Sequence, residues 1–403
     1  MNSERLITKW RFWPVVCVAF IYLISNAFIS LAIPLYFFQQ GIPIEIISFL
    51  SSALPLTYCI SPILFNKISN KLGRKKSVTI GLFGIVISQF SFYISLVPAV
   101  FLIARLSEGM FGGLIFPNLQ ASISDNKFED PSRYLAIFTV SFNIGGVLGL
   151  IFAALYNFVL SDVQLVFYFS PILILVNLII TIVFFQEPLK KMVKNSVNQE
   201  DQSSTRKGSV EGVNKEFIIP VIIPMVLNVA LMFAQGISTF LYPIKSEILG
   251  FEPYTAYILS FCGLTTQTIA NYIINMASFN KIKYASLIAL PLISLIVIAF
   301  AFNTEYIIFI LLFLALGFLN GILYASAFKL FITLNMNKET SKFTSIMESS
   351  QGITYFLTLM VIGYVAGINM VLAFYILAIS VLIAFLINAI FLNKFREDRE
   401  DII

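Results

Sequence analysis

Runs of about twenty uncharged, mostly apolar residues recur along this chain from residue 13 to residue 392, and they constrain its fold more than any other feature. The hydrocarbon core of a bilayer is about 30 Å thick, so a helix needs about 20 apolar residues to cross it. Twelve runs reach this length. They lie at about 13–38, 44–66, 78–97, 99–122, 134–157, 163–185, 217–243, 253–277, 284–302, 306–331, 343–366 and 370–392. We therefore predict an all-α membrane protein with twelve transmembrane helices.

The composition supports this class and argues against others. Hydrophobic residues make up 58% of the chain and charged residues 12%, whereas charged residues make up about 25% of soluble proteins. Histidine, the commonest metal ligand and general base, does not occur in the sequence. The cysteines lie inside apolar runs without metal-ligand spacing, at Cys17, Cys59 and Cys262. We expect no metal, no cofactor, no enzymatic activity and no nucleic-acid partner.

One connection between predicted helices is much longer than the others. The segment "EPLKKMVKNSVNQEDQSSTRKGSVEGVNKE" (187–216) is polar and charged, and a segment of this kind cannot bury enough apolar surface to fold alone. It separates six predicted helices from six. We expect an N-terminal six-helix bundle in 1–186, a linker in 187–216, and a C-terminal six-helix bundle with a short tail in 217–403.

The basic residues indicate the orientation in the membrane. If each predicted helix reverses the direction of the chain, 24 of the 26 Lys and Arg residues fall on the side of the N-terminus. The densest group is "NKISNKLGRKK" (66–76), while the loops of the opposite side hold only Lys245, and Arg105 lies within a span. Basic residues near span ends mark the cytoplasmic side. The pattern predicts a plasma-membrane protein with both termini in the cytoplasm.

The two predicted bundles also resemble each other in sequence. Pro34 and Gly41 recur as Pro243 and Gly250, 209 positions later. Two further matches follow at offsets of 210 and 209, namely "NKLGRKKS" (70–77) with "NKIKYAS" (280–286) and "SRYLAI" (132–137) with "SKFTSI" (341–346). Three matches at nearly one offset indicate duplication of a six-helix unit. Parallel repeats of this kind are typical of transporters, with the substrate site near the midplane between the halves.

At this point the chain resembles the major facilitator superfamily. In that family the loop between helices 2 and 3 reads G-x-L-A-D-R-x-G-R-K, and here it is "NKISNKLGRK" (66–75), with Asn66 and Asn70 in place of the Gly and the Asp. "ARLSEGMFGG" (104–113) resembles the R-x-x-x-G pattern of helix 4, and "PNLQASISDNKFEDPSRYLAIF" (117–138) resembles the passage into helix 5. The resemblance implies two pseudo-symmetric six-helix bundles and a cytoplasmic gate. The gate residues would be Asn70, Lys71, Gly73, Arg74, Lys75 and Arg133.

Glycines on helices 4 and 5 predict close helix packing. Exporters of this superfamily often carry G-x(8)-G-x(3)-G-P-x(2)-G-G on helix 5, and "SFNIGGVLGL" (141–150) matches it only in part. Small residues let the backbones of membrane helices approach closely. The packing residues we expect are Gly109, Gly113, Gly145 and Gly149.

Three ionisable residues fall deep within predicted spans, where they are rare because burying a charge in lipid is costly. Arg105 and Glu108 are three residues apart, so they share a helix face and could pair. Glu348 lies about two turns from the cytoplasmic end of its helix. All three could line the central cavity, and a carboxylate there could bind and release a proton as the halves move. Alternatively, Arg105 and Glu108 only neutralise each other, and Glu348 is solvated.

Neutral polar residues at helical spacing form the remaining site candidates. Such a stripe on a membrane helix should face protein or water rather than lipid. It serves either as hydrogen-bonding contact between helices or as substrate contact, and the sequence leaves both open. The candidates are Asn26, Asn228, Gln235, Gln267, Asn271, Gln351 and Tyr355.

The function expected from these features is secondary active transport of a small organic solute by a monomer in the bilayer. Our first hypothesis is proton-coupled efflux of an amphipathic or metabolite-like compound. The alternative is uptake or facilitated diffusion of a sugar, nucleoside or organic anion, and a remote one is a non-transporting membrane sensor on the same fold. An ATP-driven pump is disfavoured because the sequence has no G-x(4)-G-K-[ST] loop.

Overall fold

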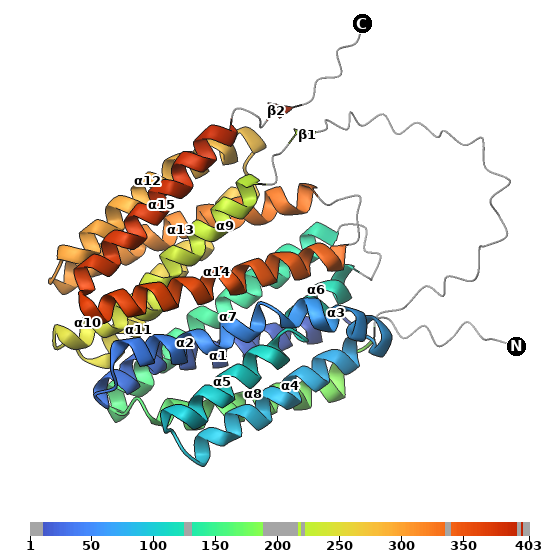
Figure 1. The fold of residues 1–403 in the computed structure, drawn as a ribbon. Coiled ribbons are helices and arrows are strands. Elements are labelled where there is room, and N and C mark those ends of the chain that lie inside the picture. Colours follow the sequence, from blue (N-terminus) through green and yellow to red (C-terminus); the bar gives the residue numbers. More distant parts are fainter. Residues whose placement is uncertain are drawn as a thin grey trace, which may run out of the picture.

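The structure is a computed structural model, which describes residues 11–124, 131–187, 217–218, 222–334, 340–392 and 396–397. Helices dominate these residues (Figure 1). The helices of the N-terminal part are α1 (Trp13–Gln39), α2 (Ile44–Tyr58), α3 (Ser61–Leu72), α4 (Arg74–Phe90), η1 (Ser91–Tyr93), α5 (Pro98–Gly112), α6 (Phe116–Ser124), α7 (Pro131–Leu160) and α8 (Leu165–Phe184). Those of the C-terminal part are α9 (Ile222–Gly236), η2 (Ile237–Leu241), α10 (Tyr242–Ile248), α11 (Pro253–Asn275), α12 (Phe279–Phe302), α13 (Tyr306–Leu334), α14 (Thr340–Ile368) and α15 (Met370–Leu392).

Several of these helices join end to end into longer rods. α2 continues into α3, α5 into α6, and α9 through the π-helical turn η2 into α10. Pro62 and Pro243 lie in the first turns of α3 and α10, where the missing N–H costs no hydrogen bond. With these joints the described residues form twelve rods, in agreement with the predicted count. Ten of the rods are long and apolar enough to cross a membrane, while α4 is too short and α11 too polar to qualify.

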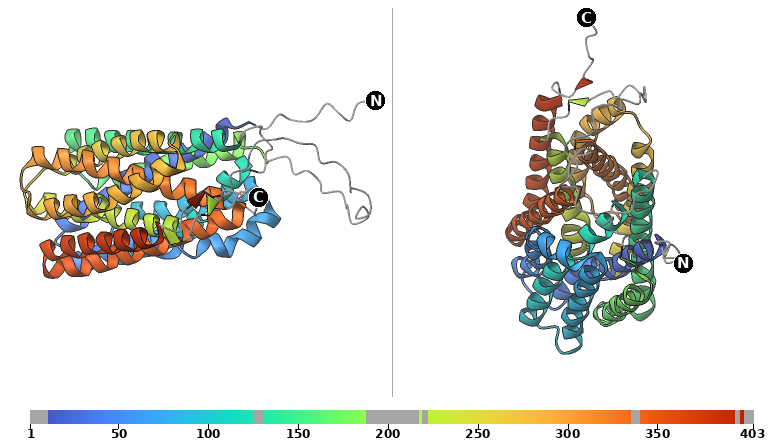
Figure 2. Two further views of the ribbon diagram at one scale, coloured as in Figure 1. Left: turned by 90° about the horizontal axis from the view of Figure 1, so that it is seen from above. Right: turned by 90° about the vertical axis from the view of Figure 1, so that its right-hand side faces the viewer.

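The rods form two groups, one from each half of the sequence (Figures 1 and 2). Rods alternate in direction, so Arg11, Gly73, Glu187 and Leu392 lie at one end of the molecule, which we call the termini end. The opposite end, with the turns at 40–43, 249–252 and 303–305, is called the far end. Contacts between the groups run mainly along α14 with α2 and along α11 with α7.

The two turns predicted to be equivalent have the same geometry. Gly41 has a φ of 71° and Gly250 a φ of 75°, a left-handed conformation that glycine adopts without steric cost. In both turns the glycine N–H bonds to the carbonyl three residues back, and the next N–H bonds to the carbonyl five residues back, at 2.9–3.0 Å. Each glycine therefore ends its helix in the same way, at the far end.

A second repeated contact joins the second rod of each group to the fourth. Thr57 Oγ1 of α2 donates to the Leu106 carbonyl of α5 at 2.7 Å, and Thr266 Oγ1 of α11 donates to the Leu314 carbonyl of α13 at 2.8 Å. The two threonines are 209 positions apart. The sequence comparison did not include this pair, so the contact supports the duplication independently.

Glycines permit this close approach. A Cβ at Gly109 would meet the Leu54 carbonyl and Thr57 Oγ1, and a Cβ at Gly317 would meet the equivalent Gly263 carbonyl and Thr266 Oγ1. The other predicted packing glycines also face neighbouring backbone. A Cβ would lie 2.8 Å from Pro62 N at Gly113, 2.5 Å from Phe20 O at Gly145 and 2.9 Å from Ile24 O at Gly149.

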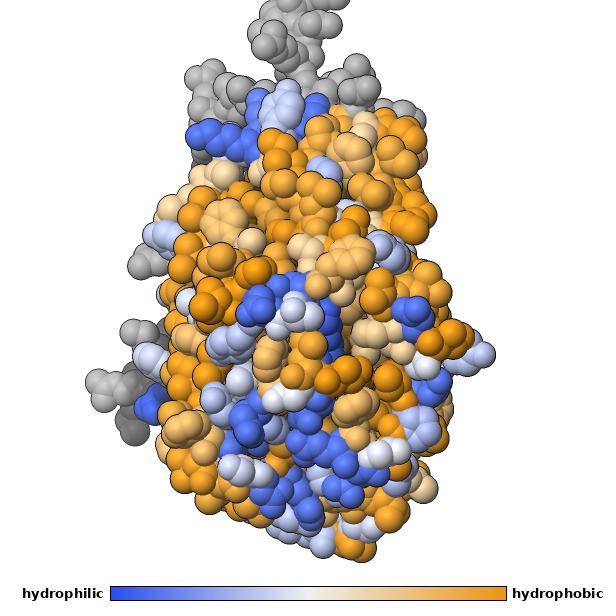
Figure 3. All heavy atoms as spheres, turned by 90° about the vertical axis from the view of Figure 1, so that its left-hand side faces the viewer, coloured by the Kyte–Doolittle hydropathy of each residue, from blue (hydrophilic) through white to orange (hydrophobic). Residues whose placement is uncertain are grey.

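The outer surface is suited to lipid. Large apolar side chains point outward along successive turns of α8 and α15, such as Ile179, Val183, Ile383 and Ile390, which are 52%, 61%, 52% and 67% exposed. Figure 3 looks onto the far end, where hydrophilic side chains gather over the middle of the face and hydrophobic ones surround them. This distribution fits rods that cross a bilayer and meet water at their ends.

The ammonium groups of two lysines, one buried and one half-buried, cap helix C-termini. Lys245 was predicted to lie in a far-side loop, but it lies within α10 and is only 8% exposed. Its Nζ donates to the carbonyls of Phe300 and Ala301, at 2.5 and 2.9 Å, where α12 ends. Lys329 does the same for the end of α11, at Asn275 O and Ala277 O. Unpaired carbonyls and the helix dipole make such an end a favourable place for a cation.

The seventh span begins later in the structure than the sequence predicted. Phe217–Ile218 forms a short strand, β1, which pairs antiparallel with β2 (Arg396–Glu397), and the helix begins only at Ile222. The apolar run alone could not reveal this pairing, because the partner lies almost 180 residues away in the sequence.

Candidate functional site: a cavity between the two bundles

A cavity lies between the two groups of rods, in two adjoining chambers. The central chamber has a volume of about 370 Å³ and the second chamber, nearer the termini end, about 260 Å³. They share eight lining residues, so they form one continuous space. These residues are Leu23, Asn26, Leu54, Pro55, Phe142, Gln235, Tyr324 and Tyr355. Both bundles contribute, as expected for a solute site at the interface of two repeats.

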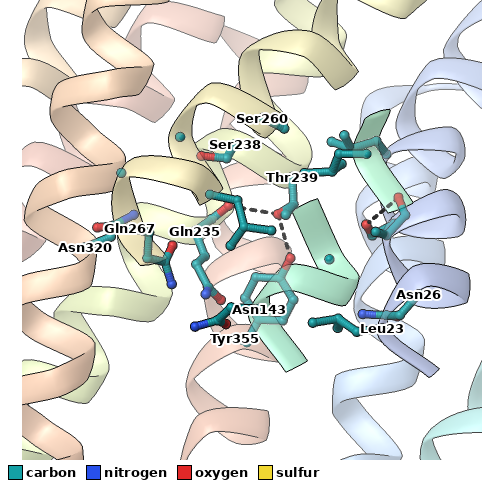
Figure 4. A pocket seen from close by; sticks show the side chains of 18 of the residues that line it. Leu23, Asn26, Asn143, Gln235, Ser238, Thr239, Ser260, Gln267, Asn320 and Tyr355 are labelled. Atoms are coloured by element: carbon teal, nitrogen blue, oxygen red, sulfur yellow. Dashed lines mark hydrogen bonds between the residues drawn. The ribbon is translucent and has the colours of Figure 1, made fainter. Parts of the chain in front are cut away.

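Carboxamides are the most distinctive side chains of the central chamber (Figure 4). Five of them line it from five different helices: Asn26 on α1, Asn143 on α7, Gln235 on α9, Gln267 on α11 and Asn320 on α13. The π-helical turn η2 adds the hydroxyls of Ser238 and Thr239. Turns of this kind are frequent at functional sites, and here the turn brings two polar side chains in succession to the cavity.

The charged pair of α5 lies at the edge of this chamber. Arg105 lines it, whereas Glu108 does not. Arg105 Nη1 donates to Glu108 Oε2, and the two residues are 5% and 2% exposed. Gln89 of α4 lies beside Glu108 and accepts a hydrogen bond from Ser170 Oγ of α8 at 3.1 Å, while Glu108 Oε1 has no partner among the described residues. The carboxylate therefore belongs to a polar network within the N-terminal bundle, and only the guanidinium reaches the cavity.

Glu348 lies in the second chamber and bridges the two bundles. Its carboxylate accepts from Tyr58 Oη of α2 at 2.8 Å and from Gln120 Nε2 of α6 at 3.5 Å. The chamber is otherwise lined mostly by aromatic and neutral polar residues, among them Tyr22 and Tyr324. The described lining contains no lysine or arginine, so Glu348 has no basic partner within this chamber.

The other polar candidates divide into two kinds. Tyr355 lines both chambers and its Oη lies 2.5 Å from Thr239 Oγ1. Gln351 lines the second chamber and also donates to Asn228 Oδ1 at 3.0 Å. Asn228 itself and Asn271 are buried but line neither chamber. Asn228 thus acts as a contact between α9 and α14.

The residues of the predicted gate lie together at the termini end. Gly73 separates α3 from α4, and the N–H groups of Arg74 and Lys75 donate to the Glu187 carboxylate at 2.7 and 2.8 Å. An acidic group at a helix N-terminus is stabilised by the free N–H groups and the dipole. Arg74 Nη1 also donates to Asn70 Oδ1 at 3.1 Å.

Two further contacts and the positions of Lys71 and Arg133 complete the description of the predicted gate. Arg74 reaches Asn118 Oδ1 of α6 at 3.2 Å, and Lys75 Nζ donates to the Ile182 carbonyl at 2.8 Å. Lys71 is exposed. Arg133 is in the first turn of α7, and its side chain lies outside the described part of the structure.

Sequence reasoning missed several residues of the site. Asn143 and Asn320 were not among the candidates, although a carboxamide inside a span was itself a signal, and each has a polar residue one turn away, Thr139 and Tyr324. Tyr58 and Gln120 lie toward the ends of predicted spans. Only their hydrogen bonds to Glu348 identify them as residues of the site. Glu187 stood at the start of the predicted linker, where no contact was expected.

Known proteins resemble this chain both in sequence and in fold. The family model for the Major Facilitator Superfamily matches residues 15–339. The chain is 25% identical over 329 residues to the quinolone resistance protein NorA of Staphylococcus aureus strain MSSA476, an alignment covering 79% of this chain and 78% of that protein. NorA of strain MRSA252 is 25% identical over 335 residues, with the same coverage.

Two solved structures share the fold at low identity. A POT family transporter in complex with a thioalcohol-conjugated peptide superposes with a TM-score of 0.75 at 12% identity, covering 95% of this chain and 96% of that one. The nucleoside transporter NupG superposes with a TM-score of 0.66 at 14% identity, covering 96% and 99%. Together with the family match over more than half of its length, this fold and cavity show that the chain belongs to the Major Facilitator Superfamily and is a multi-pass membrane transporter rather than an enzyme.

Proposed function

We propose that this protein is a proton-coupled antiporter that exports an amphipathic or metabolite-like solute across the plasma membrane by alternating access. The bundles 1–186 and 217–403 would rock about the cavity as a monomer, with the linker 187–216 and both termini in the cytoplasm. The distribution of Lys and Arg supports this orientation.

The observation that carries the proposal is that hydrogen bonds join the N-terminal bundle to the C-terminal bundle on both sides of the cavity. Toward the termini end, Tyr58 donates to Glu348. At the far end, Gln39 Nε2 donates to Glu247 Oε1 at 3.0 Å, and Tyr257 Oη donates to the Phe28 carbonyl at 3.3 Å. If one set breaks while the other holds, the cavity opens to one face at a time.

Glu348 is the residue we propose for proton coupling. It combines a position in the cavity with a hydrogen bond to the opposite bundle, so a change in its protonation would alter the contact that closes the termini end. Ionisable residues that line cavities in membrane proteins commonly mark proton pathways. Glu108 is the second candidate, although its network lies within one bundle.

The sequence relatives support export as the direction of transport. NorA is named for quinolone resistance, which suggests removal of a compound from the cell. Because the identity is 25%, we carry over the direction of transport and not the solute. The carboxamide lining of the central chamber favours the alternative, uptake or facilitated diffusion of a sugar, nucleoside or organic anion. The two candidates differ in their dependence on a proton gradient.

The test is solute flux in proteoliposomes with and without a pH gradient, using compounds that stabilise the purified protein in a thermal-shift screen. We expect a proton gradient to accelerate counterflow of the solute about tenfold or more. Glu348→Gln should abolish this acceleration and retain downhill exchange, because a glutamine keeps the shape but cannot carry a proton.

The matched control is Glu305→Gln, which removes an exposed carboxylate from the turn before α13. It should behave like the unmodified protein. Equal flux with and without the gradient would rule out proton coupling and leave facilitated diffusion. A Glu348→Gln protein that still responds to the gradient would assign the coupling to another group.

A further inference from the structure

Several buried polar atoms around the central chamber have no hydrogen-bond partner within the described protein. Both bundles supply them, three side chains from the N-terminal one and two from the C-terminal one. The atoms are Ser51 Oγ, Arg105 Nε, Asn143 Nδ2, Ser260 Oγ and Asn320 Oδ1. A buried polar group without a partner destabilises a protein. Because all five side chains belong to residues that line the same chamber, we infer that its occupant pairs with some of them.

The unpaired atoms offer both donors and acceptors. The amide group of Asn143 and the guanidinium of Arg105 donate, the Asn320 carbonyl oxygen accepts, and the serine hydroxyls do either. Asn143 and Asn320 are 5% and 3% exposed and belong to opposite bundles. A solute bonded to both would therefore bridge the two bundles.

The charge of the central chamber disfavours a cationic solute. Its described lining contains no aspartate, glutamate or lysine, and its single charged residue, Arg105, is paired with Glu108. A cation placed there would lose its hydration without gaining a counter-charge. Glu348 lines the second chamber and already accepts bonds from Tyr58 and Gln120.

The volume of the central chamber also bears on which solute it can hold. A volume of about 370 Å³ lies at the small end of the range for ligand pockets, about 300–1,000 Å³. Polar groups from several helices close around this space (Figure 4). The central chamber alone therefore suits a small solute that bonds to its polar groups, while a larger solute would have to extend into the adjoining chamber.

We propose that the central chamber selects an uncharged solute rich in hydroxyl or amide groups, such as a sugar or nucleoside, over a lipophilic cation. This inference rests on the proposed function, since it takes the cavity as the transport site. A site built to hydrogen-bond hydroxyl or amide groups rejects analogues that lack them by about 10⁴–10⁵-fold. Selectivity of that kind should be measurable in this protein.

The test measures binding to the purified full-length protein by thermal shift and calorimetry. The uncharged probes are uridine, D-xylose and N-acetylglucosamine, and the cationic probes are ethidium and tetraphenylphosphonium. At least one uncharged probe should bind, and Asn143→Leu and Asn320→Leu should each weaken it by about 100-fold or more. If either variant fails to fold, Ser260→Ala removes one unpaired hydroxyl with little change in volume.

The matched control is Asn388→Leu. Asn388 is a fully buried carboxamide on α15, and both of its polar side-chain atoms are without partners in the described structure, but it does not line the cavity. Its replacement should leave probe binding unchanged. Binding of the cations alone, or equal loss in Asn388→Leu, would overturn the inference.

Flux of the same probes into liposomes separates this inference from the proposed function. Binding of an uncharged probe without flux would refute transport and leave the chamber's selectivity intact. Flux of ethidium that Asn143→Leu and Asn320→Leu do not change would refute the selectivity and leave transport intact. Loss of ethidium binding in Glu348→Gln would then assign the cation to the second chamber.

Discussion

Glu108→Gln is expected to destabilise the protein by about 3–5 kcal/mol, the usual cost of breaking a buried ion pair by removing one partner. The Arg105 guanidinium, which is only 5% exposed, would be left buried without its counter-charge. Its Nε already has no partner in the described structure. Thermal unfolding in detergent, followed by size-exclusion chromatography of the soluble fraction, measures the loss.

The double variant Arg105→Met with Glu108→Met is the control for this prediction. Replacing a buried pair by apolar residues of similar volume is often neutral or stabilising, so the double variant should recover much of the lost stability. A Glu108→Gln protein as stable as the unmodified one would show that the two side chains are not a mutually dependent pair. Glu108 would then become a stronger candidate for proton binding.

Gly109→Ala is expected to have the second largest effect, because the added methyl group would collide with the Leu54 carbonyl and Thr57 Oγ1 of the neighbouring rod. Overpacking of this kind costs about 1–3 kcal/mol, and backbone atoms have little room to move. The expected result is a lower thermal midpoint and a lower yield of folded protein. The same substitution at Gly317 should have a similar effect, since the contact with the Gly263 carbonyl is equivalent.

Gly112→Ala provides a control on the same helix. The nearest atom to a Cβ at Gly112 would be Tyr58 Cδ2, at 3.4 Å, which is ordinary van der Waals contact. Because alanine favours helices over glycine by about 1 kcal/mol, Gly112→Ala should be neutral or slightly stabilising. If Gly109→Ala were equally well tolerated, α2 and α5 would not be packed as closely as the structure has them.

Most of the fold could be predicted from the sequence because membrane spans depend on local properties. Length, hydropathy and the absence of charge indicated the rods, and the equivalence of Gly41 and Gly250 indicated the repeat. The predictions failed where contacts between distant segments of the chain determine the structure. Lys245 is buried because α12 happens to end beside it, and Phe217 extends as a strand because it pairs with the C-terminal segment.

The site could be predicted only in part, since a polar stripe does not reveal what it faces. Gln235 and Gln267 lie on stripes that reach the cavity, whereas Asn228 and Asn271 lie on the same helices and do not. One or two turns of helix separate a residue that lines the cavity from one that does not, and only the packing of the neighbouring rods distinguishes them. Asn320 shows the converse, because it was not a candidate and yet lines the cavity together with Tyr324, one turn away.

The central claim is that the two bundles open the cavity to each face in turn, and distances between paired spin labels test it most directly. In a variant without its cysteines, Gln40→Cys with Glu252→Cys reports on the far end, and Lys67→Cys with Ser278→Cys reports on the termini end, all at exposed positions. On changing pH or adding a bound probe, we predict that one distance lengthens while the other shortens. Distances that stay fixed at both ends, or that lengthen together, would contradict alternating access.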